Sequence, residues 1–395
     1  ASGKSALYSN TTGSYNTAIG LSALQNNTTA SYNTASGIEA LKANTTGDYN
    51  TGSGYGALYS NTTGAQNAAF GRSSLAYNTT ASYNTACGHQ ALKANTTASG
   101  NTAVGHESAK ALTTGDQSTA VGRQSLYTAT TGENNTALGY TALYLSNGDE
   151  NVAVGWSAMQ QSTGSSNTAV GAAALHNTTG SYNTATGTRA GQLNTSGQEN
   201  TSVGYQTLRD NTTGGTNTAC GMQALMKNTT ASYNTAVGYS ALFENTTGYN
   251  NTAVGEQALG VNVSGWANTA VGLTALYNNT SGANNVAIGY RAGLDNTTGN
   301  YNTHLGYDAG NTTTTGEFNL CLGYNTETSA VGVDKEIVLG YSVVGKGTKT
   351  FFVASDSGVY HGGNTTTWST TSDRRTKKNI ADNNVGLSVI EQLQV

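Results

Sequence analysis

Hydrophobic and polar positions recur along the chain with a period of seventeen residues. Residues 234–250 form one unit, which reads N-T-A-V-G-x-x-A-L-x-x-N-T-T-G-x-x. The glycine that closes N-T-A-V-G returns every seventeen residues from Gly20 to Gly323, except for three steps of sixteen between Gly139 and Gly187. Such a fixed period indicates a stacked repeat architecture. We call each unit a coil and each set of equivalent positions a column.

Each coil is too short and too polar to be helical. Helical solenoids need periods of about 33 residues or more, and Asn, Thr and Gly favour turns over helices. We therefore predict an all-β chain, a parallel β-solenoid in which N-T-A-V and x-A-L-x are short extended segments. T-T-G is the predicted turn, with a positive φ at its glycine. At about 4.8 Å per coil, the rod is on the order of 100 Å long.

Three columns are predicted to form the core. They are the apolar residue before the closing glycine, the Ala before that residue, and the Leu four residues after the glycine. The first column runs from Ile19 to Leu322, and the third runs from Leu24 to Leu276. A column of Asn that includes Asn33 is expected to form stacked amide ladders at a turn. A ligand-binding role for this Asn column is the alternative.

The three sixteen-residue coils between Gly139 and Gly187 each lose one residue on the turn side. We expect a shortened loop there, and a local change of twist is the alternative.

Aromatic residues occupy two further columns. One directly follows the closing glycine, as at Trp156 and Tyr239, and the other precedes the Asn, as at Tyr15 and Tyr233. We expect these rings to stack on their neighbours and to cover the turns. The functional alternative is an exposed array that offers flat faces to sugars or to a partner surface.

Asn-X-Ser/Thr sequences recur in phase with the turns. They begin at Asn10, Asn27, Asn44, Asn61, Asn78, Asn95, Asn177, Asn194, Asn211, Asn228, Asn245, Asn262, Asn279 and Asn296. In a glycosylating secretory pathway they would coat one face of the rod with glycans. We favour the simpler interpretation that Asn and Thr are good turn residues.

Composition limits the partners. The 395 residues include no Pro, 51 Gly and only 10% charged residues, and the formal charge is −4. This weak charge argues against nucleic acid and anionic membranes. No apolar run approaches 18 residues, so no membrane insertion is expected. Because only 36% of the residues are hydrophobic, a single stack of coils buries a thin core, and we predict a homo-oligomer.

The three cysteines are interpreted as small apolar residues. Cys87 and Cys220 stand in the column before the closing glycine, and Cys321 stands in the Ala column. The eight coils between the first two exclude a disulfide that joins them within one chain. Neither the cysteines nor the histidines have the spacing of a metal site, and no cofactor is expected.

The regular repeat ends after Gly323. Residues 1–323 are predicted to form a shaft, residues 324–371 a β-rich connector, and residues 372–395 the start of another module. The chain also opens inside a repeat, because Gly3 lies seventeen residues before Gly20. We therefore expect a preceding part that this sequence lacks.

The N-T-A-I-G-x-x-A-L run at residues 16–24, with its many copies, resembles the head repeats of YadA-like trimeric adhesins. That resemblance implies a left-handed parallel β-roll packed as a homotrimer. Those repeats are shorter, and the added T-T-G turn departs from their pattern.

A second resemblance lies at the end of the chain. Residues 363–380, which contain the run S-D-R-R-T-K-K-N-I, and residues 386–393 are similar to the opening of the intramolecular chaperone domain (peptidase family S74) of phage tail fibres and endosialidase tailspikes. In that family the domain assists trimer assembly and then cuts itself off before the serine of S-D-R with a Ser-Lys pair. The matching positions are Ser372 and Lys377, and a neutral lysine can take the proton of a serine hydroxyl.

These resemblances imply the shaft of a viral tail fibre. It would be a structural homotrimer of the virion, outside the cell, that joins other virion tail proteins and supports attachment to a host cell-surface glycan or protein receptor. Apart from self-cleavage, no enzymatic activity is expected. The runner-up is a bacterial surface adhesin head that binds host matrix or glycans, although residues 372–395 contain no coiled-coil heptads or membrane anchor. Ice binding is a third possibility, against which the Thr pairs lie beside turn glycines instead of on a flat strand face.

Overall fold

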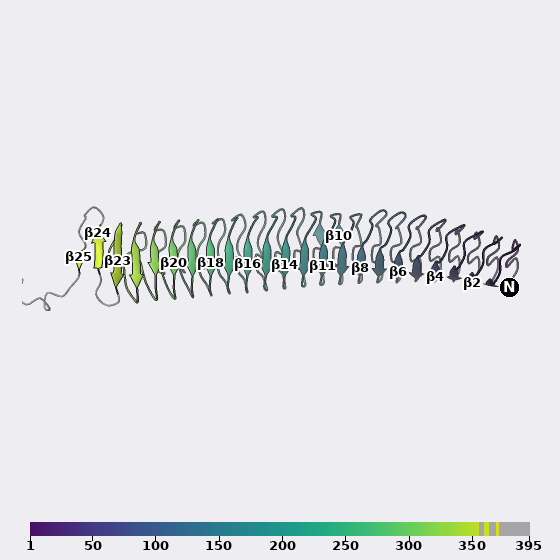
Figure 1. Ribbon diagram of the computed structural model, residues 1–395, viewed down its shortest axis with the longest axis horizontal. Helices are drawn as coiled ribbons and strands as arrows, with labels where there is room; N and C mark the ends of the chain where they lie inside the picture. Colours follow the sequence, from purple (N-terminus) through teal and green to yellow (C-terminus); the bar gives the residue numbers. More distant parts are fainter. Residues whose placement is uncertain (355–358, 363–368, 371–395) are drawn as a thin grey trace, which may run out of the picture.

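The chain is a single elongated rod in which the coils follow one another in sequence order along the long axis (Figure 1). The computed structural model describes residues 1–354 and the backbone of residues 359–362 and 369–370. All regular elements of this described part are β-strands. The predicted parallel β-solenoid of about 17 residues per coil is therefore confirmed.

Most coils contribute one strand of three residues to a single long sheet. Within the described residues the strands of this sheet are β1 (Thr17–Ile19), β2 (Thr34–Ser36), β3 (Thr51–Ser53), β4 (Ala68–Phe70), β5 (Thr85–Cys87), β6 (Thr102–Val104), β7 (Thr119–Val121), β8 (Thr136–Leu138), β9 (Val152–Val154), β11 (Thr168–Val170), β13 (Thr184–Thr186), β14 (Thr201–Val203), β15 (Thr218–Cys220), β16 (Thr235–Val237), β17 (Thr252–Val254), β18 (Thr269–Val271), β19 (Val286–Ile288), β20 (Thr303–Leu305), β21 (Leu320–Leu322), β22 (Ile337–Gly340), β23 (Thr350–Ala354), β24 (Val359–Gly362) and β25 (Ser369–Thr370).

Equivalent residues of successive coils pair directly. In β1 and β2, for example, Thr17 lies opposite Thr34 and Ala18 opposite Ala35 in a parallel register. The same register continues through β23. Each column of the sequence is thus a physical row along the rod.

The strand turns its middle residue inward and its two flanking residues outward. Ala18 is fully buried, whereas Ile19 is 53% exposed. Side chains alternate between the two faces of a strand, so a three-residue strand can direct only its central side chain into the coil. The Ala column is therefore core as predicted, but the prediction that the column before the closing glycine is core is wrong.

The predicted second strand, x-A-L-x, is a turn in the seventeen-residue coils. Ser22 and Leu24 have φ of 57° and 50°, in the left-handed region. This conformation is uncommon for residues other than glycine. It is held by bonds between coils, in which the Leu24 N–H donates to the Ala40 carbonyl at 3.0 Å. The Leu side chain is buried in the core as predicted.

The T-T-G turn also differs in detail from the prediction. Its glycine, such as Gly47, does not have a positive φ, whereas Tyr49 two residues later has a φ of 60°. The closing glycines take positive φ instead, for example 135° at Gly54.

The sixteen-residue coils keep the register of the long sheet, since Ala137 pairs with Ala153 and Ala153 with Ala169. The sixteen-residue coils are one residue shorter on the side of the coil opposite the long sheet. There β10 (Gln161–Ser162) and β12 (Asn177–Thr178) form a second short parallel pair. The expected shortened loop is confirmed, and it straightens the segment into a strand.

The parallel stack extends beyond Gly323. Strand β22 pairs in parallel with β21 and β23, after which β24 and β25 add antiparallel strands. The candidate catalytic residues Ser372 and Lys377 lie outside the described residues.

Candidate functional site

Two Asn columns hold the turns from inside the rod. In the first, the Asn33 N–H donates to Asn16 Oδ1 at 2.9 Å, and Asn16 Nδ2 donates to the Ala30 carbonyl at 2.7 Å. In the second, Asn27 Nδ2 donates to Asn10 Oδ1 at 2.8 Å and to the same Ala30 carbonyl at 3.0 Å. The predicted amide ladders are therefore confirmed. The ligand-binding alternative fails, because partners within the chain occupy these buried amides.

The second Asn column coincides with the Asn-X-Ser/Thr sequences. Twelve of these Asn side chains are buried, namely Asn27, Asn44, Asn61, Asn78, Asn95, Asn194, Asn211, Asn228, Asn245, Asn262, Asn279 and Asn296. A glycan on Nδ2 would replace a hydrogen that the ladder uses and would not fit inside the rod. The favoured interpretation as turn residues therefore holds for these positions.

The outer face of the long sheet, which we call the strand face, carries two columns. The first strand position is Thr in most coils, and the third is an aliphatic residue such as Val104 or Val254, each 37% exposed. Cys87 and Cys220 stand in the aliphatic column and are exposed, which corrects their predicted place in the core. Cys321 is buried as predicted, and burial raises the pKa of its thiol to about 12.

The aromatic columns form stacked ladders on the surface. Tyr290, Tyr307 and Tyr324 stack with ring centroids 4.7 and 5.1 Å apart. Tyr15 and Tyr32 do the same at 4.9 Å, although Tyr15 is 78% exposed. The stacking interpretation is confirmed for these rings. Because their faces cover one another, mainly the ring edges point to solvent.

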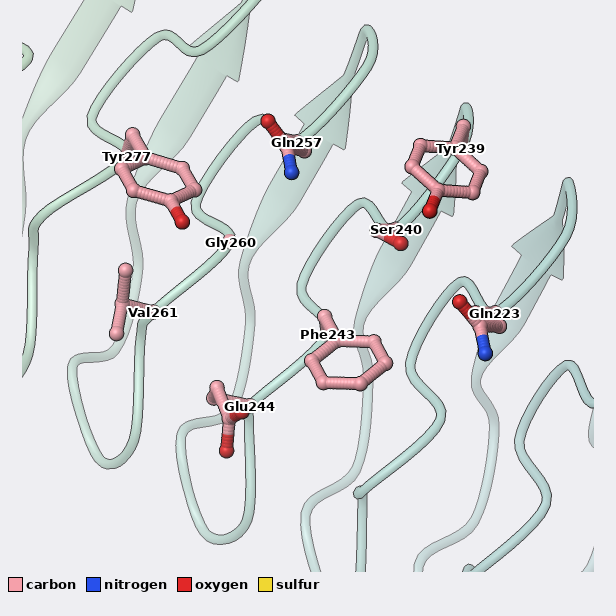
Figure 2. Close-up of a pocket in the computed structure, with 9 residues that line it drawn as sticks. All are labelled: Gln223, Tyr239, Ser240, Phe243, Glu244, Gln257, Gly260, Val261 and Tyr277. Carbon is pink, nitrogen blue, oxygen red and sulfur yellow. The ribbon is translucent and has the colours of Figure 1, made fainter.

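A hollow of about 290 Å³ interrupts the surface at Gly260, and we call it the Gly260 notch (Figure 2). Its column, five residues after the closing glycine, has an aromatic ring on either side of the glycine, at Phe243 and Tyr277. Tyr239, Glu244 and Gln257 complete its polar rim.

The charges beside the notch are paired. Lys227 Nζ donates to both carboxylate oxygens of Glu244, at 2.7 and 2.8 Å. The same ammonium lies 5.1 Å from the centre of the Phe243 ring. This contact covers the side of the ring that faces the preceding coil.

His304 is an unusual core residue. It replaces Ala in the inward column between Ala287 and Cys321, is fully buried, and neither ring nitrogen has a hydrogen-bond partner. Burial lowers the pKa of His304 to about 4, so the ring is neutral at pH 7.

Within the described residues no group of three or more His, Cys, Asp or Glu side chains could hold a metal ion. The same part of the chain has no helix that could cross a membrane. No family model matches the sequence, and no curated protein is significantly similar to it.

The outward strand face and the notch were missed in the sequence. An Ala between two larger residues in most of the short strands was the signal for the first, because side chains alternate along a strand and a small one fits most easily inside a narrow coil. Gly260, in a column that otherwise holds mostly long side chains such as Lys, Tyr, Gln and Phe, was the signal for the second.

Proposed function

We propose that the chain is the shaft of an elongated homotrimeric fibre of a viral tail, which carries attachment to a host cell surface. The observation that supports it most is the unbroken register of the long sheet from β1 to β23. Continuous ladders make a stiff spacer whose length is set by the number of coils. The likeness of residues 363–380 to tail-fibre chaperone domains supports the viral setting, with other tail proteins as partners.

The strand face is the proposed contact between copies. Its third strand position is apolar in most coils, with Ser36, Ser53 and Thr186 as exceptions, and monomeric proteins rarely expose continuous apolar patches of more than a few hundred Å². The core of each rod is thin, since its inward strand residue is usually Ala. Covering the aliphatic column would add the apolar burial that one chain lacks. Three copies is the number implied by the resemblance of the N-T-A-V-G core.

The two exposed cysteines test this arrangement without added residues. In a parallel, in-register assembly, Cys87 faces its own copies and Cys220 faces its own, eight coils away. We expect a mass of about 121 kDa, three times the 40.3 kDa of the chain, and bis-maleimide cross-links that join Cys87 to Cys87 and Cys220 to Cys220. An antiparallel pair would instead join Cys87 to Cys220.

Cys87→Val is the matched control, because Val104 and Val121 occupy the same column. This variant should lose the cross-link between Cys87 residues and keep the mass of the trimer. A stable monomer at micromolar concentration, or cross-links only between Cys87 and Cys220, contradicts the proposal.

Residues 372–395 are proposed to begin a chaperone module that cuts the chain before Ser372, with Lys377 as the base. The test is expression of the complete reading frame with and without Ser372→Ala, followed on a denaturing gel. The unchanged protein should yield a chain that ends at Thr371, and the variant should stay intact. Equal processing of both would remove Ser372 from this role.

One observation favours ice binding as a second candidate. Besides the Thr pairs beside the turn glycines, a separate Thr column at the first strand position lies on the outward strand face, as in β1 and β2. If the strand face is covered in a trimer, the intact protein should show no thermal hysteresis. Measurable hysteresis would favour ice binding over assembly.

A further inference from the structure

We infer that the Gly260 notch binds one pyranose ring of a neutral carbohydrate. The inference deepens the proposed attachment function, on which it rests, by assigning a ligand class to a defined place on the shaft. The notch lies outside the strands, among residues that follow the closing glycines (Figure 2). None of the residues that line the notch belongs to the strand face through which the copies are proposed to meet.

The glycine makes the notch by interrupting a ladder. In the same column Tyr127 and Tyr144 stack at 4.9 Å and leave no space between them. At Gly260 an edge of the Tyr277 ring leans over the backbone, where a Cβ would lie 2.8 Å from Cε2. Phe243 has Lys227 on the side of the preceding coil, so its other side faces Gly260. The notch thus has a ring face and a ring edge free of ring stacking.

Hydrogen-bonding groups surround these rings. The Gln257 amide and the hydroxyls of Tyr239 and Ser240 make no side-chain hydrogen bond within the described part of the chain, and all three line the notch. Glu244 is fixed by Lys227 and keeps acceptor capacity on its carboxylate. An amide, a carboxylate and hydroxyls match the hydroxyl groups of a sugar, whose C–H faces pack on aromatic rings.

Size and charge favour a single neutral ring. The volume of about 290 Å³ lies at the lower limit of small-molecule sites, about 300 Å³. A phosphate or sulfate would need an unpaired cation, and the ammonium beside the notch already pairs with Glu244. A planar base would need two parallel ring faces, whereas Tyr277 presents an edge.

A hollow with a similar arrangement of ring, lysine and small residue occurs a second time. Around Ala76, which shares the column of Gly260, a hollow of about 220 Å³ is lined by Tyr59, Tyr77 and Glu39, and by Lys93, whose ammonium lies 5.5 Å from the centre of the Tyr77 ring. Lys42 lies 5.4 Å from the centre of the Tyr59 ring and pairs with Glu39 at 2.8 Å. Eleven coils away from Gly260, an aromatic ring thus again has a paired lysine on one side. On its other side it is open beside a small residue. Two weak sites on one rod, multiplied by the copies in a fibre, favour a surface with repeated sugars.

Saturation-transfer NMR on the full chain tests the inference, with the methyl glycosides of glucose, galactose, mannose and N-acetylglucosamine as probes. We expect saturation transfer to at least one of them, with a millimolar Kd. The double variant Gly260→Tyr/Ala76→Tyr fills both hollows with rings, as Tyr127 and Tyr144 do, and should weaken binding at least tenfold. Gln257→Ala in the Ala76→Tyr background should weaken binding at least threefold relative to Ala76→Tyr alone.

Gln90→Ala is the matched control, because Gln90 has the place of Gln257 in another coil and lines neither hollow. It should bind as the unchanged protein does. No transfer to any of the four glycosides, or equal binding by the double variant, overturns the inference. Mass and cysteine cross-links of the same samples report separately on assembly, so a failed sugar site and a failed fibre proposal give different results.

Discussion

At the scale of single residues, buried Asn side chains fill part of the interior of the coil, which apolar side chains fill in thicker folds. Asn279 is fully buried, donates from Nδ2 to Asn262 Oδ1 at 2.8 Å and to the Gly282 carbonyl at 2.9 Å, and accepts from Asn296 Nδ2 at 2.8 Å. The turn carbonyls would otherwise be buried without partners, at a cost of about 1–3 kcal/mol each. The Asn columns therefore allow a narrow coil to close its turns.

Asn279→Ala should lower the free energy of unfolding by about 3 kcal/mol, because it leaves Asn296 Nδ2 short of an acceptor and opens a gap in the ladder. The adjacent Asn278→Ala is the control, since the Asn278 side chain donates from Nδ2 to Oδ1 of exposed Asp295 at 3.1 Å. Its effect should stay within about 0.5 kcal/mol. Denaturant unfolding measures both, and equal losses would contradict the ladder argument.

His304 makes the rod sensitive to acid. The ring fits because Gly293 and Gly310 stand where other coils carry Leu, and a Cβ on Gly293 would lie 2.8 Å from the ring. The titratable group beside it, Cys321, has a raised pKa and stays neutral. The pKa of His304 falls from 6.5 to about 4 on folding. Above pH 6.5 the imidazole is neutral in both the folded and the unfolded chain, so only there does burying it leave the free energy of unfolding undiminished.

Stability should therefore fall as the pH drops from 6.5 through about 4, by up to about 3 kcal/mol, since protons then bind the unfolded chain more tightly. The double variant His304→Ala/Gly310→Leu restores the Ala and Leu of other coils and should lose this dependence. Leu tolerates the position, as Leu24 has a φ of 50° there. Thermal unfolding across this pH range compares the two. Parallel pH profiles would contradict the assignment.

Some of these features of single residues could be predicted from the sequence, and others could not. The Asn ladders followed from one residue type held in phase along the rod. Burial of His304 could not be predicted, because it depends on the room left by Gly310 in its own coil and by Gly293 in the preceding one. The outward direction of Val104 was also missed, since its apolar character suggests a core residue, whereas alternation along the strand directs it away from the side on which Ala103 is buried.

At the scale of the coil, a three-residue strand is followed by a turn that uses left-handed residues twice. The strand could be predicted from T-A-V, with its small and β-branched residues. The turn could not, because A-L has no preference for positive φ and adopts it through bonds to the neighbouring coils. The closing glycines are required for a different reason. Their φ is near 135°, and their Cα atoms lie so close to the backbone of the next coil that a Cβ would clash with it.

Gly54→Ala should destabilise the rod by about 3 kcal/mol or more, because φ is 135° and the new Cβ would lie 2.6 Å from the Gly71 carbonyl oxygen. Gly56→Ala is the control two residues later. There φ is 62° and the nearest atom is 4.0 Å away. Because other coils carry Ser or Gln in that column, we expect less than about 1 kcal/mol. Comparable unfolding midpoints for both variants would refute the role of the close approach.

At the scale of the whole molecule, the contacts between strands in the described part of the chain join neighbouring coils, and the length of the rod follows from the repeat number. This is why the rod could be predicted from periodicity, although 36% hydrophobic residues would be low for a globular domain. The Gly260 notch could not be predicted in the same way. The notch depends on a single glycine that departs from the repeat and on the positions that the Phe243 and Tyr277 rings take beside it.

The axial direction of the pairing between coils has a mechanical consequence. Tension applied at the two ends of a single rod loads the bonds of one terminal coil at a time, so the chain peels instead of shearing. Each seventeen-residue coil pulled straight releases up to about 58 Å of chain for the 4.8 Å or so of rod that it gives up. A lone chain would therefore make a compliant tether, and side-by-side copies that share the load would turn the same sequence into a stiff strut.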